Sequence, residues 1–217
     1  MAEFQKQCRQ RQASLHIIDA PGPATPTAPL HFLPLFQQRN FGLVLEAIKY
    51  VVERDGLPEL SDAAVLQAAH THIPGRMEEL HRGQQVIVLD GAHNPQKLQT
   101  LRESLAERYP GQPVAAMVSF IKGGGRSLPA MLREMEPLYT HIIVTAPSEA
   151  GRHAWYAPEE VGQIAQEIGI TSLEVITNYK QACQSFLQRP EPVLVVTGSL
   201  YALAPMWHYL HDVVSAV

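Results

Sequence analysis

The residues that could do chemistry are concentrated in one short stretch, Val86-Ile87-Val88-Leu89-Asp90-Gly91-Ala92-His93-Asn94-Pro95. Its four leading apolar residues are typical of a buried strand, and Asp90 and His93 follow where that strand ends. In open α/β sheets, ligands bind at the carboxyl ends of the strands, and a helix that starts beside them presents free N–H groups to a phosphate. We therefore expect a polar site here, with Asp90 and His93 in it.

The same residues also have an ordinary structural interpretation. Gly91-Ala92 permits a turn, Asn94 can cap the next helix, and Pro95 suits the first helical position. Asp90 is able to orient a ribose, a metal-bound water or an incoming amine, and equally able to hydrogen-bond the turn that follows it. His93 is a candidate phosphate contact and also a candidate structural histidine. The sequence alone leaves both interpretations of these two residues open.

Two more polar residues fall in predicted loops. Arg76 follows Pro74-Gly75 just before the first strand, where its fixed donors and permanent charge suit a developing oxyanion. A surface ion pair with a neighbouring glutamate is the alternative for this arginine. Ser199 follows the last strand, where its hydroxyl either caps the final helix or meets a substrate carboxylate.

The elements that must hold these residues alternate regularly along the second part of the chain. The predicted strands are Val86–Asp90, Val114–Ile121, His141–Ala146, Leu173–Thr177 and Val193–Gly198. The predicted helices begin near Pro95, Ser127, Pro158, Asn178 and Leu200. Because strands that alternate with helices indicate crossover connections, we expect an α/β fold with a Rossmann-like, mostly parallel sheet and helices on both faces. No Gly-x-Gly-x-x-Gly follows the first strand, so a nicotinamide cofactor gains no support.

The amino-terminal part has a different pattern. A polar helical opening leads to a short predicted strand, Leu15–Ile18, and then to five prolines between Pro21 and Pro34 that argue for an extended segment. Apolar positions predict a helix from Asn40 to about Asp55, and Ser61-Asp62 opens another helix through Ala69. A pair of helices is therefore expected to lead into the main domain.

Composition and charge narrow the function. The 217 residues carry a formal net charge of −4, and the basic cluster Lys6, Arg9 and Arg11 is short, so nucleic-acid binding is disfavoured. Cys8 and Cys183 are too few for a disulfide framework and lack metal-site spacing, which favours a reducing compartment. The sequence shows neither a signal-peptide core nor an apolar run of membrane-spanning length, so we expect a cytoplasmic protein without a membrane partner.

Ordered motifs carry a family resemblance. Gly75-Arg76-Met77-Glu78 precedes Asp90-Gly91-Ala92-His93-Asn94-Pro95, and Val196-Thr197-Gly198-Ser199-Leu200-Tyr201 follows far downstream. Together with Gln37-Gln38-Arg39-Asn40, which is similar to the family's Gln-x-x-Asn helix start, they resemble the carboxyl-terminal part of folylpolyglutamate synthase/dihydrofolate synthase. That family belongs to the Mur ligase superfamily of ATP-dependent enzymes that form amide bonds. The resemblance covers roughly residues 37 to 201.

The resemblance implies a reaction and a set of site residues. In the family, ATP phosphorylates the terminal carboxylate of a folate, and the amino group of glutamate attacks the acyl phosphate. ATP and magnesium are the implied cofactors, and folate and glutamate are the implied substrates. The implied site residues are catalytic Asp90 and His93, ATP-binding Asn40, Arg76 and Asp90, and substrate-binding Ser199, Lys122 and Arg126.

Two departures from the family pattern bear on activity. The sequence contains no P-loop of the Gly-x-x-Gly-Lys-Ser/Thr kind, and the family's magnesium ligands belong to sequence that would precede Met1. Where the family tends to have Asp-Lys-Asp, this chain has Ile121-Lys122-Gly123, and a lysine without flanking acids is also typical of a solvated loop. We expect residues 1–72 to be the end of the central ATPase domain and residues 73–217 to be the Mur ligase-type carboxyl-terminal domain. The chain by itself is then incomplete for catalysis.

Other functions fit the same observations. A non-catalytic module that binds a nucleotide or folate, or that pairs with a separate ATPase chain, is favoured by the absent P-loop. A fragment of a Mur-type peptidoglycan ligase also fits, because the superfamily shares the Asp-x-Ala-His-Asn-Pro turn, but Gly-Ser-Leu-Tyr and Gly-Arg-Met-Glu favour the folate branch. If residues 1–72 belong against an ATPase domain, their apolar groups lead us to expect self-association or a mobile amino terminus. These groups are Leu33, Leu35, Phe36, Phe41 and Leu45.

Overall fold

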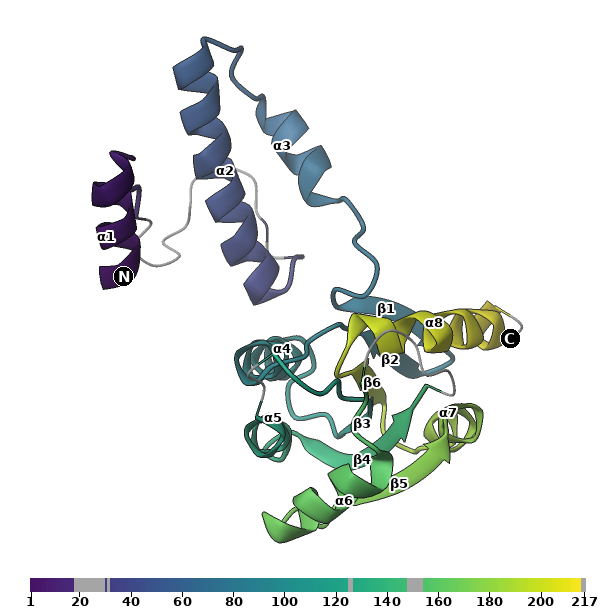
Figure 1. Ribbon diagram of the computed structural model, residues 1–217. Coiled ribbons are helices and arrows are strands. Elements are labelled where there is room, and N and C mark those ends of the chain that lie inside the picture. Colours follow the sequence, from purple (N-terminus) through teal and green to yellow (C-terminus); the bar gives the residue numbers. More distant parts are fainter. Residues whose placement is uncertain (18–29, 31, 125–126, 148–153, 216–217) are drawn as a thin grey trace. The chain divides into compact units, whose positions relative to one another are not determined.

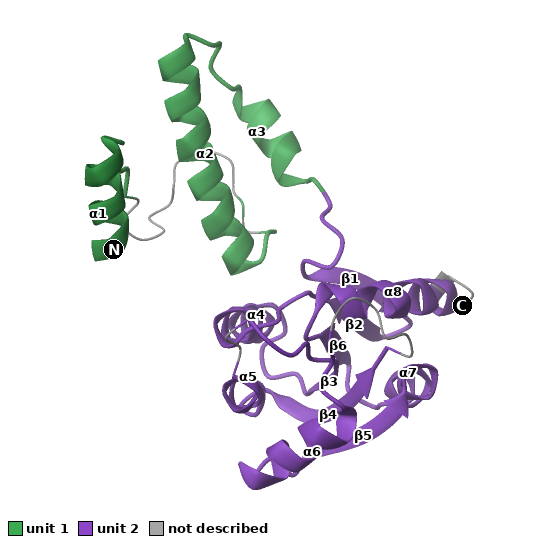
Figure 2. Cartoon of the chain, viewed as in Figure 1, with its two compact units in different colours: residues 1–71 green, residues 72–217 purple. Residues whose placement is uncertain are grey.

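The computed structural model describes residues 1–17, 30, 32–124, 127–147 and 154–215. The chain divides into two compact units, residues 1–71 (unit 1) and residues 72–217 (unit 2), which Figure 2 colours separately. The described elements of unit 1 are helices: α1 (Ala2–Arg11), α2 (Leu35–Asp55) and α3 (Asp62–Ala69). Among the described residues, no helix is long and apolar enough to cross a membrane.

Unit 2 is a six-stranded sheet with helices on both faces (Figure 1). Its elements are β1 (Glu78–Arg82), β2 (Gln85–Leu89), α4 (Pro95–Arg108), β3 (Val114–Val118), α5 (Leu128–Met135), β4 (Tyr139–Ala146), α6 (Pro158–Glu167), β5 (Leu173–Asn178), α7 (Tyr179–Leu187), β6 (Val193–Thr197) and α8 (Leu200–Ser215). The strand order is β1-β2-β6-β3-β4-β5, and all neighbouring pairs are parallel except β1–β2. The predicted Rossmann-like, mostly parallel α/β fold is confirmed.

Burial explains why the central strands form where they do. Every residue of β3 and of β6 is buried, as expected for strands that are covered on both faces. Successive side chains of a strand point to opposite faces, so Leu194 and Val196 of β6 share one face, where they pack with Phe186 of α7 and Leu210 of α8. Figure 1 shows α7 and α8 on one side of the sheet and α4 and α5 on the other.

Two strand assignments differ from the sequence-based prediction. β1 was not predicted, because Leu80 is the only apolar residue in Glu78–Arg82. It pairs antiparallel with β2 through a two-residue turn, and Gly83 at the first turn position has φ +58°. The predicted strand at Leu15–Ile18 is wrong for residues 15–17, which are in no strand, and Ile18 lies outside the described residues. A strand needs a hydrogen-bonded neighbour, and the described part of unit 1 is helical.

The helix starts follow their local signals, with one exception. Asn94, Ser127 and Asn178 each accept a hydrogen bond from a backbone N–H in the first turn of α4, α5 and α7. α2 begins at Leu35, five residues before the predicted start at Asn40. Asn40 therefore lies in the second turn of α2 with its side chain exposed, so it does not cap this helix. Pro34, which has extended backbone angles, sets this earlier start.

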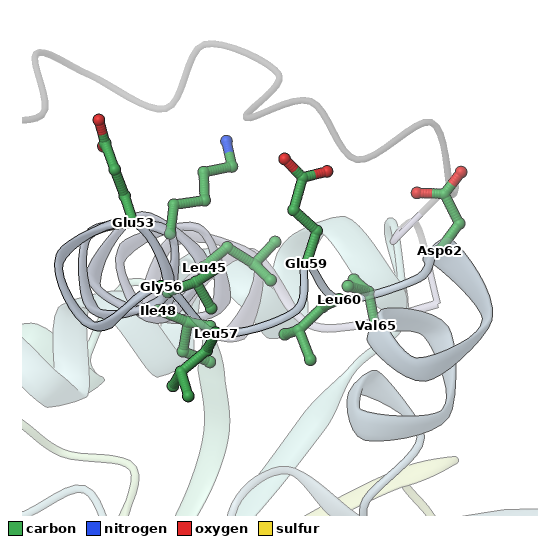
Figure 3. A pocket seen from close by; sticks show the side chains of 11 residues that line it. Leu45, Ile48, Glu53, Gly56, Leu57, Glu59, Leu60, Asp62 and Val65 are labelled. Carbon is green, nitrogen blue, oxygen red and sulfur yellow. The ribbon is translucent and has the colours of Figure 1, made fainter.

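Unit 1 contains a cavity of about 700 Å³ between the second half of α2, the following loop and α3. Figure 3 shows the side chains of Ile48, Leu57 and Leu60 on one side of it and the carboxylates of Glu53 and Glu59 on the other.

Five apolar residues of unit 1 were expected to lie against an ATPase domain. Of these, Leu45 is buried, and Leu33, Leu35, Phe36 and Phe41 are half-buried. The exposed apolar side chains of α2 are Leu43, Val44, Tyr50 and Val51.

We expect the exposed stripe on α2 to cause concentration-dependent self-association. Leu43 and Tyr50 are seven residues apart, as are Val44 and Val51, so the four side chains share one helix face. Val44→Glu is expected to shift the chain towards monomer in light scattering, because it places a charge in the middle of that face. Glu53→Gln, which changes a residue nine positions along α2 and on the opposite side of the helix from Val44, is the control. A chain that stays monomeric at the highest soluble concentration contradicts this prediction.

Candidate functional site at the carboxyl ends of β2 and β6

Asp90 and Ser199 lie after two neighbouring parallel strands. β2 ends at Leu89 and β6 ends at Thr197, and the two strands pair in parallel. The backbone N–H of Asp90 donates to Val196 O at 3.0 Å, which continues this pairing past the end of β2. Asp90 and Ser199 therefore lie together at the carboxyl ends of two neighbouring strands, where a polar site is expected. The ligand roles of the residues here stay predictions.

Asp90 is a buried carboxylate whose two oxygens both accept backbone hydrogen bonds. Oδ1 accepts from the N–H of Ala92 at 2.8 Å, and Oδ2 accepts from the N–H of Met77 at 3.0 Å. Its residue is 5% exposed. Asp90 therefore stabilises both the turn that follows it and the loop before β1. The structural interpretation of this residue is correct.

Burial raises the pKa of Asp90 to about 6. The hydrogen bonds from Met77 and Ala92 and the positive charges of Arg76 and Lys97 act in the opposite direction, and they offset only part of the effect of burial. Asp90 is thus mostly ionised at neutral pH and carries its proton in mildly acidic solution. A carboxyl group with this pKa can exchange a proton near physiological pH.

Arg76 lies in a loop that is fastened to the Asp90 turn. Gly75 O accepts a hydrogen bond from the N–H of Gly91 at 2.9 Å and another from Nη1 of Arg76 at 3.2 Å. A Cβ atom on Gly91 would lie 2.7 Å from Nη1 of Arg76 and would overlap the side chain of Leu200. A side chain at position 91 would therefore have to displace Leu200 and the guanidinium of Arg76, which pack directly over Gly91.

His93 has a defined tautomer when neutral. Its Nδ1 is 2.7 Å from Gly91 O, and a carbonyl oxygen only accepts, so Nδ1 carries the hydrogen. Nε2 is then the acceptor for Nζ of Lys97 at 3.4 Å. His93 and Lys97 thereby form a polar pair on the first turn of α4. Arg76 and Lys97 both act on the charge of Asp90, so two cationic side chains that suit an anionic ligand lie near the Asp90 turn.

The hydroxyl of Ser199 is hydrogen-bonded to the first turn of α8. Its Oγ accepts from the N–H of Tyr201 at 3.2 Å, and the residue is 2% exposed. Gly198 before it has φ +102° and donates its N–H to Ala92 O at 2.9 Å. The capping interpretation of Ser199 agrees with this geometry, and the hydroxyl has no open path to a substrate carboxylate in this conformation.

The structure pairs Lys122, another of the predicted residues, with groups outside this cluster. Nζ of Lys122 forms an ion pair with Glu160 of α6 at 2.7 Å and lies 5.1 Å from the ring centre of Tyr156. Lys122 therefore has an acidic neighbour, but from α6 and not from its own loop. Asn40 belongs to unit 1, and Arg126 lies outside the described residues.

Sequence analysis missed a polar network around Glu78. The carboxylate of Glu78 accepts hydrogen bonds from the N–H of Gly75, from Nε1 of Trp207 and from Nε2 of His211. In the sequence, Glu78 stands out only as part of Gly-Arg-Met-Glu and, with Glu79, as a candidate ion-pair partner of Arg76. Trp207 and His211 lie far away in the sequence and within a predicted helix, so no local pattern pointed to them.

Comparison with known proteins agrees with the fold and the motifs. Residues 75–200 match the family model described as "Mur ligase, glutamate ligase domain". The chain is 24% identical over 167 residues to the folylpolyglutamate synthase of Lacticaseibacillus casei, covering 76% of this chain and 36% of the relative. The match to the family model extends over more than half of the chain, so the protein belongs to the Mur ligase family through its glutamate ligase domain.

Solved structures give the same result. The chain is similar to E. coli FolC in complex with ADP, with a TM-score of 0.65 and 20% identity over 84% of this chain and 41% of that chain. It is also similar to the Yersinia pestis bifunctional folylpolyglutamate synthase/dihydrofolate synthase complexed with AMPPNP and Mn, with a TM-score of 0.58 and 24% identity over 71% of this chain and 35% of that chain. The predicted resemblance to the carboxyl-terminal part of such enzymes is confirmed, and the chain spans less than half the length of these relatives.

Proposed function

We propose that this chain is the carboxyl-terminal domain of an ATP-dependent folylpolyglutamate synthase, which adds glutamate to folate through an acyl phosphate. The observation that carries the proposal is the fastening of the Arg76 loop to the Asp90 turn at the edge where β2 and β6 end. This cluster lies within the residues that match the glutamate ligase domain. In this proposal the domain closes over a nucleotide that is held mainly by an ATPase domain.

The chemistry of the donor set fits an anionic ligand. ATP, when bound, supplies the phosphoryl group that activates the folate carboxylate. Arg76 would neutralise phosphate charge, and Lys97, which donates to Nε2 of His93, would add a second positive charge. Asp90 would keep Arg76 in place through the N–H of Met77. Among the described residues there is no group of three or more histidine, cysteine or acidic side chains arranged for a metal ion, so we propose none of them as magnesium ligands.

We expect the 217-residue chain by itself neither to hydrolyse ATP nor to form folyl-glutamate bonds, because its sequence contains no glycine-rich phosphate loop. Phosphate release and separation of folate products measure this. In a ligase completed by an ATPase domain, whether from the same gene or as a separate chain, Arg76→Ala should lower kcat on the order of 100-fold. Arg133→Ala, on the exposed side of α5, should leave it unchanged.

The coding sequence upstream of Met1 offers an inexpensive check. An in-frame phosphate-binding loop there supports the ligase proposal. A completed protein that ligates no glutamate to any folate, while the chain binds nucleotide or folate, favours the non-catalytic module. Activity on peptidoglycan precursors in place of folate assigns the chain to the other branch of the superfamily. Turnover by the purified 217-residue chain contradicts our view of its active site.

A further inference from the structure

Glu78 is a buried carboxylate that joins the loop before β1 to the distant helix α8. Its side chain is 3% exposed. On the loop side, Oε2 accepts from the N–H of Gly75 at 2.8 Å. On the α8 side, Oε1 accepts from Nε1 of Trp207 at 2.9 Å and from Nε2 of His211 at 3.1 Å. The Trp207 and His211 rings are in contact, with centroids 3.8 Å apart.

The loop that Glu78 holds is the one that carries Arg76. Gly75 and Glu78 bracket Arg76 and Met77, so the bond from the Gly75 N–H to Glu78 closes the loop on itself. Met77 has φ +50°, a left-handed conformation that non-glycine residues rarely adopt. In that conformation the N–H of Met77 reaches Asp90. Hydrogen bonds at both ends of the loop therefore maintain a backbone shape that the sequence does not prefer.

The two histidines near this carboxylate favour its charged form. Nε2 of His72, from the segment before the loop, lies 3.6 Å from Oε1, and His211 approaches from α8. Burial by itself raises the pKa of Glu78, but the hydrogen bonds from Gly75, Trp207 and His211, together with the charge of His72, hold the pKa below its ordinary value. Glu78 is thus ionised at neutral pH, when its hydrogen bonds are strongest.

We propose that Glu78 is a positioning residue, through which α8 holds the 75–77 loop in the shape that places Arg76 and Asp90 for an anionic nucleotide. The inference deepens the function proposed above and rests on it for the identity of the ligand. Glu78 itself touches no ligand in this proposal. Trp207 and His211 of α8 donate hydrogen bonds to Glu78 and thereby keep its carboxylate in place.

The test compares the full chain with four variants by NMR, and one of them, Glu78→Ala, removes the carboxylate. Glu78→Gln keeps one acceptor oxygen but loses the charge, and Trp207→Phe removes one donor while leaving Glu78 intact. The matched control is Glu79→Gln, which changes the next residue of β1 and acts on contacts with Arg108, His81 and Tyr109 instead. Amide hydrogen exchange at Gly75 and Met77 reports the loop, and an ADP titration followed at Arg76 and Gly91 reports the site.

In Glu78→Gln and Trp207→Phe, we expect exchange at Gly75 and Met77 to accelerate by about tenfold, because a charge-assisted hydrogen bond is weakened or lost. The apparent ADP affinity should fall by roughly tenfold in parallel, with Glu79→Gln unchanged in both measurements. Glu78→Gln should be less impaired than Glu78→Ala, since the amide oxygen can still accept from Gly75.

The outcomes separate the two proposals. If ADP shifts Arg76 and Gly91 equally in the wild-type chain and in folded Glu78 and Trp207 variants, the positioning role is overturned and the proposed function stands. If exchange accelerates as expected but saturating ADP leaves the wild-type Arg76 and Gly91 signals unmoved, the nucleotide role fails, and the positioning proposal fails with it. Accelerated exchange at the same two amides in Glu79→Gln assigns the effect to general loosening of β1 and also overturns the proposal.

Discussion

Gly198→Ala is expected to lower the free energy of unfolding by roughly 3 kcal/mol or more. Gly198 follows β6 with φ +102°, which side chains rarely adopt. A Cβ atom there would overlap the carbonyl oxygen of Ser119 and would lie 3.1 Å from its backbone nitrogen. Ser119 cannot move away easily, because it is buried at the end of β3 and its hydroxyl donates to Thr145 O at 2.7 Å. Urea unfolding measures the loss.

Gly111→Ala separates the two causes of this effect. Gly111 has φ +71°, but nothing lies within 4 Å of a Cβ atom built on it. Its substitution therefore carries only the penalty of the left-handed conformation, about 1 kcal/mol. If Gly198→Ala unfolds at the same urea concentration as Gly111→Ala, the close approach of the β6 turn to Ser119 is not a constraint on the fold.

The sheet could be predicted because its signals are local. β3 and β6 are short, continuous apolar runs, and the helices after them begin at cap residues such as Ser127, so composition and spacing are enough to place them. β1 could not be predicted, because it carries one apolar residue and is held by pairing with β2. The start of α2 was placed five residues late, since the apolar pattern was counted from Asn40 and not from Pro34.

The candidate site was predictable only in part for a similar reason. The position of Asp90 follows from the strand that precedes it, whereas its hydrogen bond to Met77 depends on how a loop 13 residues away folds back. Glu78 meets Trp207 and His211 across 129 and 133 residues. Such pairs are products of tertiary packing, and neither residue type nor spacing in a single sequence indicates them. The same holds for Lys122, whose acidic neighbour, Glu160, comes from another helix.

Asp90 is expected to make the chain less stable as the pH rises between about 4 and about 6. Its pKa is near 6 in the folded protein, above the ordinary aspartate pKa of 3.8 that applies to the unfolded chain, so the folded state binds this proton more tightly. The resulting stabilisation is complete below the unfolded pKa and is lost as the pH rises through the folded pKa. A shift of about two pH units corresponds to about 3 kcal/mol, within a factor of two.

Asp90→Asn removes this titration, so the difference in unfolding free energy between wild type and variant should change by a few kcal/mol from pH 4 to pH 7. The absolute stability of the variant is less informative, because an amide has one oxygen to accept from both Met77 and Ala92. Glu79→Gln is a control of opposite sign: burial raises the pKa of Glu79, but the hydrogen bond and charge of Arg108 and the other neighbours hold it below its ordinary value. The stability that Glu79 contributes is therefore present above its unfolded pKa and is lost as the pH falls. A wild-type minus Asp90→Asn difference that is flat across this range would mean that Asp90 is solvated in solution, and that the Met77 loop does not close over it.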